Sequence, residues 1–436
     1  MNTRDRFFKF VIPSMLAFAL SGIYSIADGF FVGNAIGDQA LAAINIAYPL
    51  TAFLQAVGTG IGMGGAVEYS IQTGNNNPKG AGKYFGMSVI LLIIAGIFFT
   101  LLFLVAAPGV LGLFGASGTI LELAREYMLY ISFGAIFQVL GTGLVPLIRN
   151  MGGSVTAMAA MITGFLTNIL LDYLFVWILP WGMMGAAVAT GIGQLMTFIV
   201  CAGFFLVRKA KPVFCFGKDK LRLIRRILLI GLSPMGLTFS PNITLILVNK
   251  SASAVGGDTA VTCYALISYL SCIIMLLLQG ISDGCQPLIS LACGKGNTRD
   301  IRAVRSMAYR FSLAVAFVAM AGLFILRRPA ISLFGASPGI VEEVAGILPI
   351  FLVGYLFVSF SRVSTAYFYA AGRNLPAYLL IYGEPLMLFL FLLLLPMLTG
   401  GILGTWLAVP LSQAAAMLLA VICIRHDQKK QLLSSK

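Results

Sequence analysis

The chain has 436 residues, of which 59% are hydrophobic and only 10% are charged. Soluble domains carry about 25% charged residues, so a water-exposed fold of ordinary composition is excluded. The formal net charge of +14 does not indicate nucleic-acid binding, because most of the basic residues flank long apolar runs. The composition therefore indicates a protein that crosses a membrane several times.

Twelve apolar runs, separated by turn residues, follow one another along the chain. One bilayer crossing takes about 20 residues of helix, whereas the strands of a transmembrane barrel have only about ten. We predict spans at about 10–33, 41–70, 84–106, 121–146, 155–178, 184–207, 228–250, 260–290, 304–326, 345–371, 376–398 and 402–424. The expected fold class is therefore all-α, with twelve transmembrane helices.

The basic residues are distributed unevenly between the two ends of these spans. Only four of the 29 Lys and Arg residues fall on one side of the predicted membrane: Arg125, Lys250, Arg327 and Arg328. Because loops rich in Lys and Arg remain in the cytoplasm, we expect both termini to be cytoplasmic in a multi-pass plasma (inner) membrane protein. Contact with anionic lipid headgroups is a natural by-product of this distribution.

The two halves of the sequence are related by a repeat. Leu113–Ser117 (LFGAS) recurs as Leu333–Ser337 at an offset of 220 residues, which becomes 219 in the last span of each half. Because each half has an even number of spans, both halves share one orientation, as in membrane proteins built from parallel repeats. We predict two six-helix lobes around a central cleft, with a first lobe at 1–207, a basic cytoplasmic linker at 208–227, and a second lobe and tail at 228–436.

A glycine-rich stretch, Gly58–Gly65, lies in the second predicted span. Small residues let membrane helices approach closely, whereas bending is the alternative role for such a stretch. The composition favours close packing.

Ionisable residues inside spans are costly in lipid and indicate functional sites. In the first half these include Asp28 and Asp172, and Asn168 lies one helical turn before Asp172 on the same face. The repeat places apolar residues at all three equivalent positions of the second half. The polar set therefore belongs to one half only, which is unexpected for a structural requirement shared by both lobes.

The depths of these residues place them together. At about 1.5 Å per residue, Asp28, Asp172 and Thr190 lie at one level near the outer ends of their spans. Two carboxyl groups in a low-dielectric site do not both ionise cheaply, so one keeps its proton or a cation binds between them. Oxygen ligands suit a hard cation, and we predict a coupling site for H⁺ or Na⁺. A structural hydrogen-bond cluster is the alternative.

Three further ionisable residues, Asp283, Arg362 and Glu384, lie in spans of the second half. A buried arginine between two acids is most simply an ion pair that holds helices together or latches a gate. Contact with the substrate is the alternative role for these three residues.

The sequence has few residues of the kinds that form catalytic or metal-binding sites. The one histidine, His426, lies in the charged tail, and no pair among the seven cysteines has metal-ligand spacing. We therefore expect neither an enzyme nor a bound cofactor.

Two segments resemble signature sequences of the multidrug and toxic compound extrusion (MATE) family. Ile12–Gly33 with Gly37–Ala43 resembles its first-span signature, and Gly280–Ser290 resembles its eighth-span signature. The closest likeness is to the MepA-like bacterial branch. The resemblance implies a secondary active multidrug efflux antiporter that exports lipophilic cationic compounds in exchange for H⁺ or Na⁺ by alternating access. We expect it to act as a monomer in the bilayer, with no nucleic-acid partner.

The resemblance also implies roles for individual residues. In DinF-type members a cation site in the first lobe uses an Asp, an Asn, a second Asp and a Thr, which match Asp28, Asn168, Asp172 and Thr190. A tyrosine on the fourth span contributes to that site, and Tyr127 is the better match here, with Tyr130 as second choice. NorM-type members place acids on spans seven and ten, and this chain has none at 232–248 or 346–371.

The main alternative function is a lipid-linked oligosaccharide flippase of the same broad superfamily. Its headgroup-binding cleft is expected to be more basic, whereas the charges within the spans here are mostly acidic. A channel is compatible with the composition, but a repeat with one asymmetric acidic site fits coupled transport better.

Overall fold

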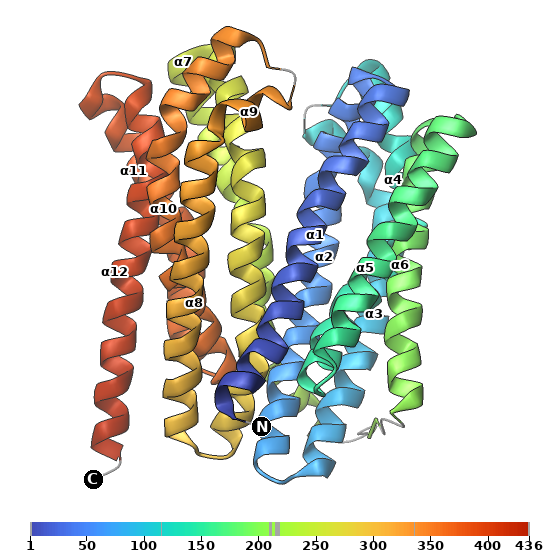
Figure 1. The fold of residues 1–436 in the computed structure, drawn as a ribbon. Helices are drawn as coiled ribbons and strands as arrows, with labels where there is room; N and C mark the ends of the chain where they lie inside the picture. Colours follow the sequence, from blue (N-terminus) through green and yellow to red (C-terminus); the bar gives the residue numbers. More distant parts are fainter. Residues whose placement is uncertain (1, 115, 209–211, 214–218, 335, 435–436) are drawn as a thin grey trace. The chain divides into compact units, whose positions relative to one another are not determined.

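The computed structural model describes residues 2–114, 116–208, 212–213, 219–334 and 336–434, and nearly all of these are helical (Figure 1). The repeated Gly115 and Gly335 and most of the predicted linker before Asp219 lie outside the described residues. The elements are α1 (Thr3–Ala35), α2 (Asp38–Gly74), α3 (Pro78–Leu113), α4 (Gly118–Asn150), α5 (Ser154–Asp172), the π-helix η1 (Tyr173–Ile178), α6 (Gly182–Val207), α7 (Asp219–Gly294), α8 (Thr298–Ile325), α9 (Arg327–Ser332), α10 (Pro338–Ala370), α11 (Asn374–Thr399) and α12 (Ile402–Ser434).

Helix α7 contains two spans. Its 76 residues are interrupted at Gly257, whose φ of 66° and ψ of −159° are not helical. A straight helix of that length would far exceed the roughly 30 Å hydrocarbon core of a bilayer. Within the described residues, eleven helices are long and apolar enough to cross a membrane. The two arms of α7 account for the twelfth span, so the predicted all-helical membrane fold is confirmed.

The same turns recur in both halves at the offset of the repeat. The bounds of α10 are those of α4 shifted by 220 residues. Gly37 and Gly257 both have positive φ, at 115° and 66°, and so do Gly152 and Gly372, at 87° and 68°. Positive φ is strained for residues with a Cβ. This explains why glycine occupies both of these turn positions in each half.

The chain forms two compact units. The first-half unit contains Phe8–Phe239 and Ser290–Thr298, and the second-half unit contains Met1–Phe7, Ser240–Ile289 and Arg299–Lys436. In the first-half unit α4 packs against α2, α3, α5 and α6, whereas in the second-half unit α10 packs against α9, α11 and α12. The fourth helix of each repeat is therefore central to its own unit.

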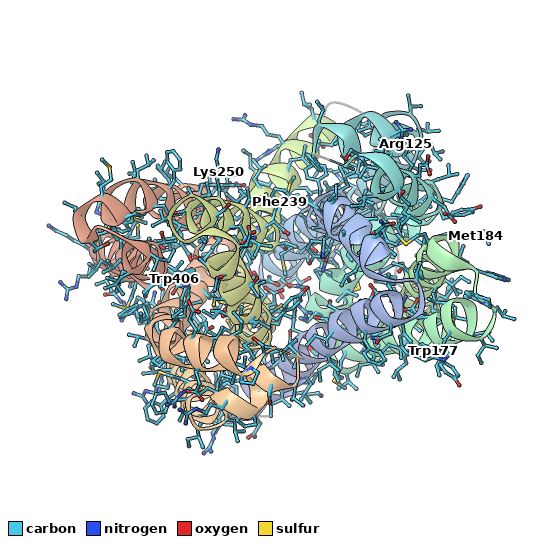
Figure 2. The ribbon with its side chains drawn as sticks, turned by 90° about the horizontal axis from the view of Figure 1, so that it is seen from above. Arg125, Trp177, Met184, Phe239, Lys250 and Trp406 are labelled. Atoms are coloured by element: carbon cyan, nitrogen blue, oxygen red, sulfur yellow. The ribbon has the colours of Figure 1, made fainter. Side chains whose placement is uncertain are left out.

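One end of the first-half unit is closed by the connection from η1 into α6. Trp177 of η1 and Met184 of α6 lie at the same edge of this unit (Figure 2). The backbone N–H of Met184 donates to Oε1 of Glu126 on α4 at 3.2 Å. The start of α6 is therefore tied to α4, and this fixes the position of Thr190 further along α6.

The glycine-rich part of α2 makes backbone contact with two other helices of the first-half unit. A Cβ added at Gly62 would overlap the carbonyl oxygen of Gly143 on α4, and one added at Gly64 would overlap that of Ile227 on α7. Backbone atoms do not yield as a flexible side chain does. Close packing therefore explains these glycines.

Gly62→Ala is expected to lower the free energy of unfolding by about 1–3 kcal/mol, as overpacking of a tight interface does. The apparent melting temperature in detergent, followed by size-exclusion fluorescence, measures this loss. Gly109→Ala on α3 is the matched control, because a Cβ there meets no atom within 4 Å. An unchanged melting temperature for Gly62→Ala would contradict the close-packing explanation.

Candidate cation site

Two helices of the first-half unit bring the predicted acids together. The carboxyl groups of Asp28 on α1 and Asp172 at the end of α5 lie within hydrogen-bonding reach of each other. Asp172 is fully buried and Asp28 is half-buried. Residues 144 positions apart in the sequence are therefore adjacent, as their predicted depths suggested.

Asn168 holds α5 to α6 beside this pair. In the amide orientation that gives both polar atoms a partner, its nitrogen donates to Oδ2 of Asp172 at 3.0 Å. Its oxygen accepts from the backbone N–H of Thr190 at 3.1 Å. The hydroxyl of Thr190 donates to the carbonyl of Ala186 at 3.0 Å, one turn earlier on α6. Asn168 therefore orients one oxygen of Asp172 and leaves the other unconstrained.

That other oxygen, Oδ1 of Asp172, is buried and receives no hydrogen bond from the described residues. The neighbouring carboxyl group of Asp28 is a donor only when it is protonated. A buried carboxylate oxygen without a donor carries a desolvation penalty of about 1–3 kcal/mol or more. The pair is therefore stabilised by a proton on one carboxyl group, or by a cation that both carboxylates coordinate.

Two tyrosine hydroxyl groups border the acids. Those of Tyr127 on α4 and Tyr24 on α1 lie within hydrogen-bonding reach of Thr190 and close to both carboxyl groups. Tyr127 is thus the fourth-span tyrosine at the site, whereas Tyr130 packs against the apolar core of the unit.

The sequence reasoning missed Tyr24, although a signal was present. Tyr24 precedes Asp28 by four residues, which places both side chains on one face of α1. Its ring stacks on Phe165 of α5, with centroids 5.0 Å apart and planes at 10°. This contact joins α1 to α5, one turn before Asp28 and two turns before Asp172.

A π-helical turn, η1, follows Asp172 directly. Such turns are rare and occur frequently at functional sites. The corresponding residues of the second half continue as ordinary α-helix within α11. The backbone irregularity, like the polar residues, therefore belongs to the first half only.

The second-half residues form a separate network around Gln279. Its nitrogen donates to Oδ1 of Asp283 at 2.8 Å, and Nη1 of Arg362 donates to its oxygen at 2.9 Å. The hydroxyl of Tyr369 donates to Oδ1 of Asp283 at 3.1 Å, and Glu384 lies close enough to attract Arg362 electrostatically. A neutral amide thus links the two buried charges on α7 and α10. The sequence did not identify this link, because the partner of a half-buried glutamine depends on tertiary contacts.

Gln279→Leu is expected to destabilise the second-half unit by about 1–3 kcal/mol, since Asp283 and Arg362 lose a shared partner while remaining buried. The apparent melting temperature in detergent tests this. Gln55→Leu is the control, because Gln55 is an exposed glutamine on α2. Equal melting temperatures for the two variants would contradict a stabilising role for Gln279.

The sequence is similar to known transporters over nearly its whole length. The profile of the MatE family matches residues 13–174 and 234–391. The multidrug export protein MepA of Staphylococcus aureus (strain NCTC 8325 / PS 47) is 25% identical over 425 residues, which cover 95% of this chain and 92% of that protein. The FAD transporter of Shewanella oneidensis is 23% identical over 435 residues, which cover 96% of this chain and 93% of that protein.

Solved structures share the fold. A MOP superfamily transporter from Pyrococcus furiosus Vc1 has a TM-score of 0.91 at 23% identity, over 98% of this chain and 96% of that one. A multidrug resistance MATE family transporter of the MOP superfamily, in an outward-facing conformation, also has a TM-score of 0.91, at 22% identity over 100% of this chain and 98% of that one.

Proposed function

Because the chain belongs to the MatE family, and is therefore a transporter and not an enzyme, we propose that it is a secondary active multidrug efflux antiporter. The proposed exchange is of lipophilic cationic compounds for H⁺ or Na⁺. Its likeness along almost the whole chain to MepA, a multidrug export protein, supports the export of drugs. The observation that carries the coupling assignment is the buried Oδ1 of Asp172, without a donor, beside the carboxyl group of Asp28.

In this proposal each polar residue has its own part. Asp28 and Asp172 carry the charge that a proton or Na⁺ neutralises, and Asn168 holds Asp172 in position through Oδ2. The oxygens of Thr190 and Tyr127 are available beside the pair as further ligands or hydrogen-bond partners for the coupling ion. The site needs no cofactor.

Exchange follows from charge neutralisation. A pair of ionised carboxyl groups in a low-dielectric interior attracts a cation. When the coupling ion is absent, a cationic cargo can neutralise the pair instead. Binding of the coupling ion neutralises the negative charge of the acid pair and so weakens the binding of the cargo cation. In this proposal, cargo and ion therefore favour different states of the transporter. Alternating access between the two lobes then converts this competition into antiport.

A cationic cargo suits the charges of the interior better than a phosphorylated one. Asp28, Asp172, Asp283 and Glu384 are acidic, whereas Arg362 is already held by Gln279. We propose that the second-half network acts as a gate or contacts the cargo. The protein is proposed to work as a monomer in the plasma membrane, with both termini in the cytoplasm.

Asp28→Asn and Asp172→Asn are each expected to reduce ion-driven ethidium efflux from energised vesicles at least tenfold, because a neutral amide cannot be titrated or bind a cation comparably. Asp258→Asn is the control, since Asp258 is an exposed aspartate beside Gly257. Unreduced efflux in both site variants, at equal amounts of folded protein, would contradict the coupling assignment.

Imposing a pH gradient and a Na⁺ gradient separately identifies the coupling ion. The gradient that drives efflux by the native protein is expected to drive no efflux by the Asp172→Asn variant. Export of FAD at rates comparable with ethidium would contradict the cationic cargo, because several acids in the interior repel a flavin nucleotide.

A further inference from the structure

Two helix ends that are expected in the cytoplasm touch each other through glycine. Gly74 is the last residue of α2, and Gly294 is the last residue of α7. A Cβ added at Gly74 would overlap the carbonyl oxygen of Leu291, and one added at Gly294 would overlap that of Ile71. Backbone atoms do not yield as a flexible side chain does. The two ends therefore pack this closely only because neither has a side chain at this point.

The repeat relates the two sides of this contact to each other. Gly74 and Gly294 are counterparts at the offset of 220 residues, and so are Ile71 and Leu291. A Cβ added at either glycine would lie 2.9 or 3.0 Å from the Cα of the other. Each side thus presents the same positions to its partner, as in the self-complementary contacts of two-fold-related copies. Here the first half of the sequence meets the second half through equivalent residues.

The segment that contributes Gly294 belongs to the second half by sequence and to the first-half unit by packing. Ser290–Thr298 is grouped with Phe8–Phe239, whereas the residues on either side of this segment belong to the second-half unit. Gly74 is buried, and the residues that follow the two glycines, Asn75 and Lys295, are exposed. The contact therefore lies where a short piece of the second half ends against α2 at the border with water.

The first part of α7 is held to α2 in a different way. Glu68 of α2 is only 1% exposed and forms an ion pair with Arg226 of α7. Removing one partner of a buried ion pair is strongly unfavourable, because the other charge stays in the interior. The tight backbone contact of Gly64 with Ile227 lies beside this pair. Separation of this part of α7 from α2 is therefore unfavourable.

The contact between the two glycines can open without a comparable loss. The carbonyl of Ile71 accepts from the N–H of Asn75 at 3.0 Å, and the carbonyl of Leu291 accepts from the N–H of Lys295 at 3.1 Å. Both hydrogen bonds lie within one helix end, so they persist when the two ends separate. For these two carbonyl groups, separation removes only van der Waals contact, which is weak for each pair of atoms.

We propose that the contact between Gly74 and Gly294 is the cytoplasmic seal of the transporter. It is closed in this structure, and it opens when Ser290–Thr298 leaves α2, while the first part of α7 stays on α2 through Glu68. The inference rests on alternating access in the proposed function and adds which segment separates. Glycine is required on both sides, because a side chain on either one prevents the ends from closing.

The test measures the opening of the seal by electron paramagnetic resonance on the full-length protein in nanodiscs. Spin labels at Lys79 and Arg299, exposed counterparts near the starts of α3 and α8, report the distance. They are attached through p-acetylphenylalanine, so the native cysteines remain. Gly74→Ala is expected to raise the ratio of the longer-distance population to the shorter one at least tenfold, since its Cβ overlaps the backbone of the opposite helix end.

Gly62→Ala is the matched control. A Cβ at Gly62 also overlaps a backbone carbonyl, that of Gly143, but α2 and α4 both belong to the first half. This variant is expected to lower the melting temperature and to leave the label distances unchanged. An unchanged distribution in Gly74→Ala would overturn the proposal, and so would an equal shift in Gly62→Ala.

Gly294→Ala introduces the same overlap from the other side of the contact. It is expected to shift the label distances as Gly74→Ala does, and it keeps the test valid if Gly74→Ala does not fold. An unchanged distribution in this variant would also overturn the proposal. The labels report conformation and not efflux, so the outcome does not depend on the coupling ion or the cargo. A failure of the seal is therefore distinguishable from a failure of the proposed antiport.

Discussion

The first half of this protein holds two carboxyl groups close together in an interior where an unpaired charge is unfavourable. Asp172 is fully buried, and Asn168 satisfies only one of its two oxygens. The neighbouring carboxyl group of Asp28 can donate to the second oxygen only when it is protonated. No side chain in the described residues relieves this conflict. This conflict is the basis of the proposed coupling to H⁺ or Na⁺.

The duplication explains why this site can be asymmetric without loss of the fold. The bounds of α4 recur in α10, and glycine turns recur at Gly37 and Gly257 and at Gly152 and Gly372, so this part of the scaffold does not depend on the polar residues. The second half has apolar residues at the positions of Asp28, Asn168 and Asp172, and its α11 lacks the π-helical turn of η1.

Much of this architecture could be predicted from the sequence. Long apolar runs can cross a bilayer only as helices or barrels, and counting residues along helices placed Asp28, Asp172 and Thr190 at one depth. Counting does not give the rotation of one helix against another, so the contact of Tyr24 with the site was not predicted. The link through Gln279 and the unpartnered hydroxyl of Ser154 were not predicted for a similar reason. Whether a polar atom has a partner depends on residues that the fold brings from far along the chain.

Helix α7 shows how the proposed alternating access relates to the sequence. Its first part, up to Phe239, belongs to the first-half unit, where Ile227 contacts Gly64 through the backbone. The chain passes into the second-half unit at Ser240, and the next residue is Pro241. Proline has no N–H to donate to the carbonyl four residues earlier, so the carbonyl of Leu237 loses its usual helical partner. The helix therefore lacks one backbone hydrogen bond beside the point where it leaves one unit for the other. A bend there leaves the packing of α2 against α7 intact, and that packing is what the glycines of α2 make possible.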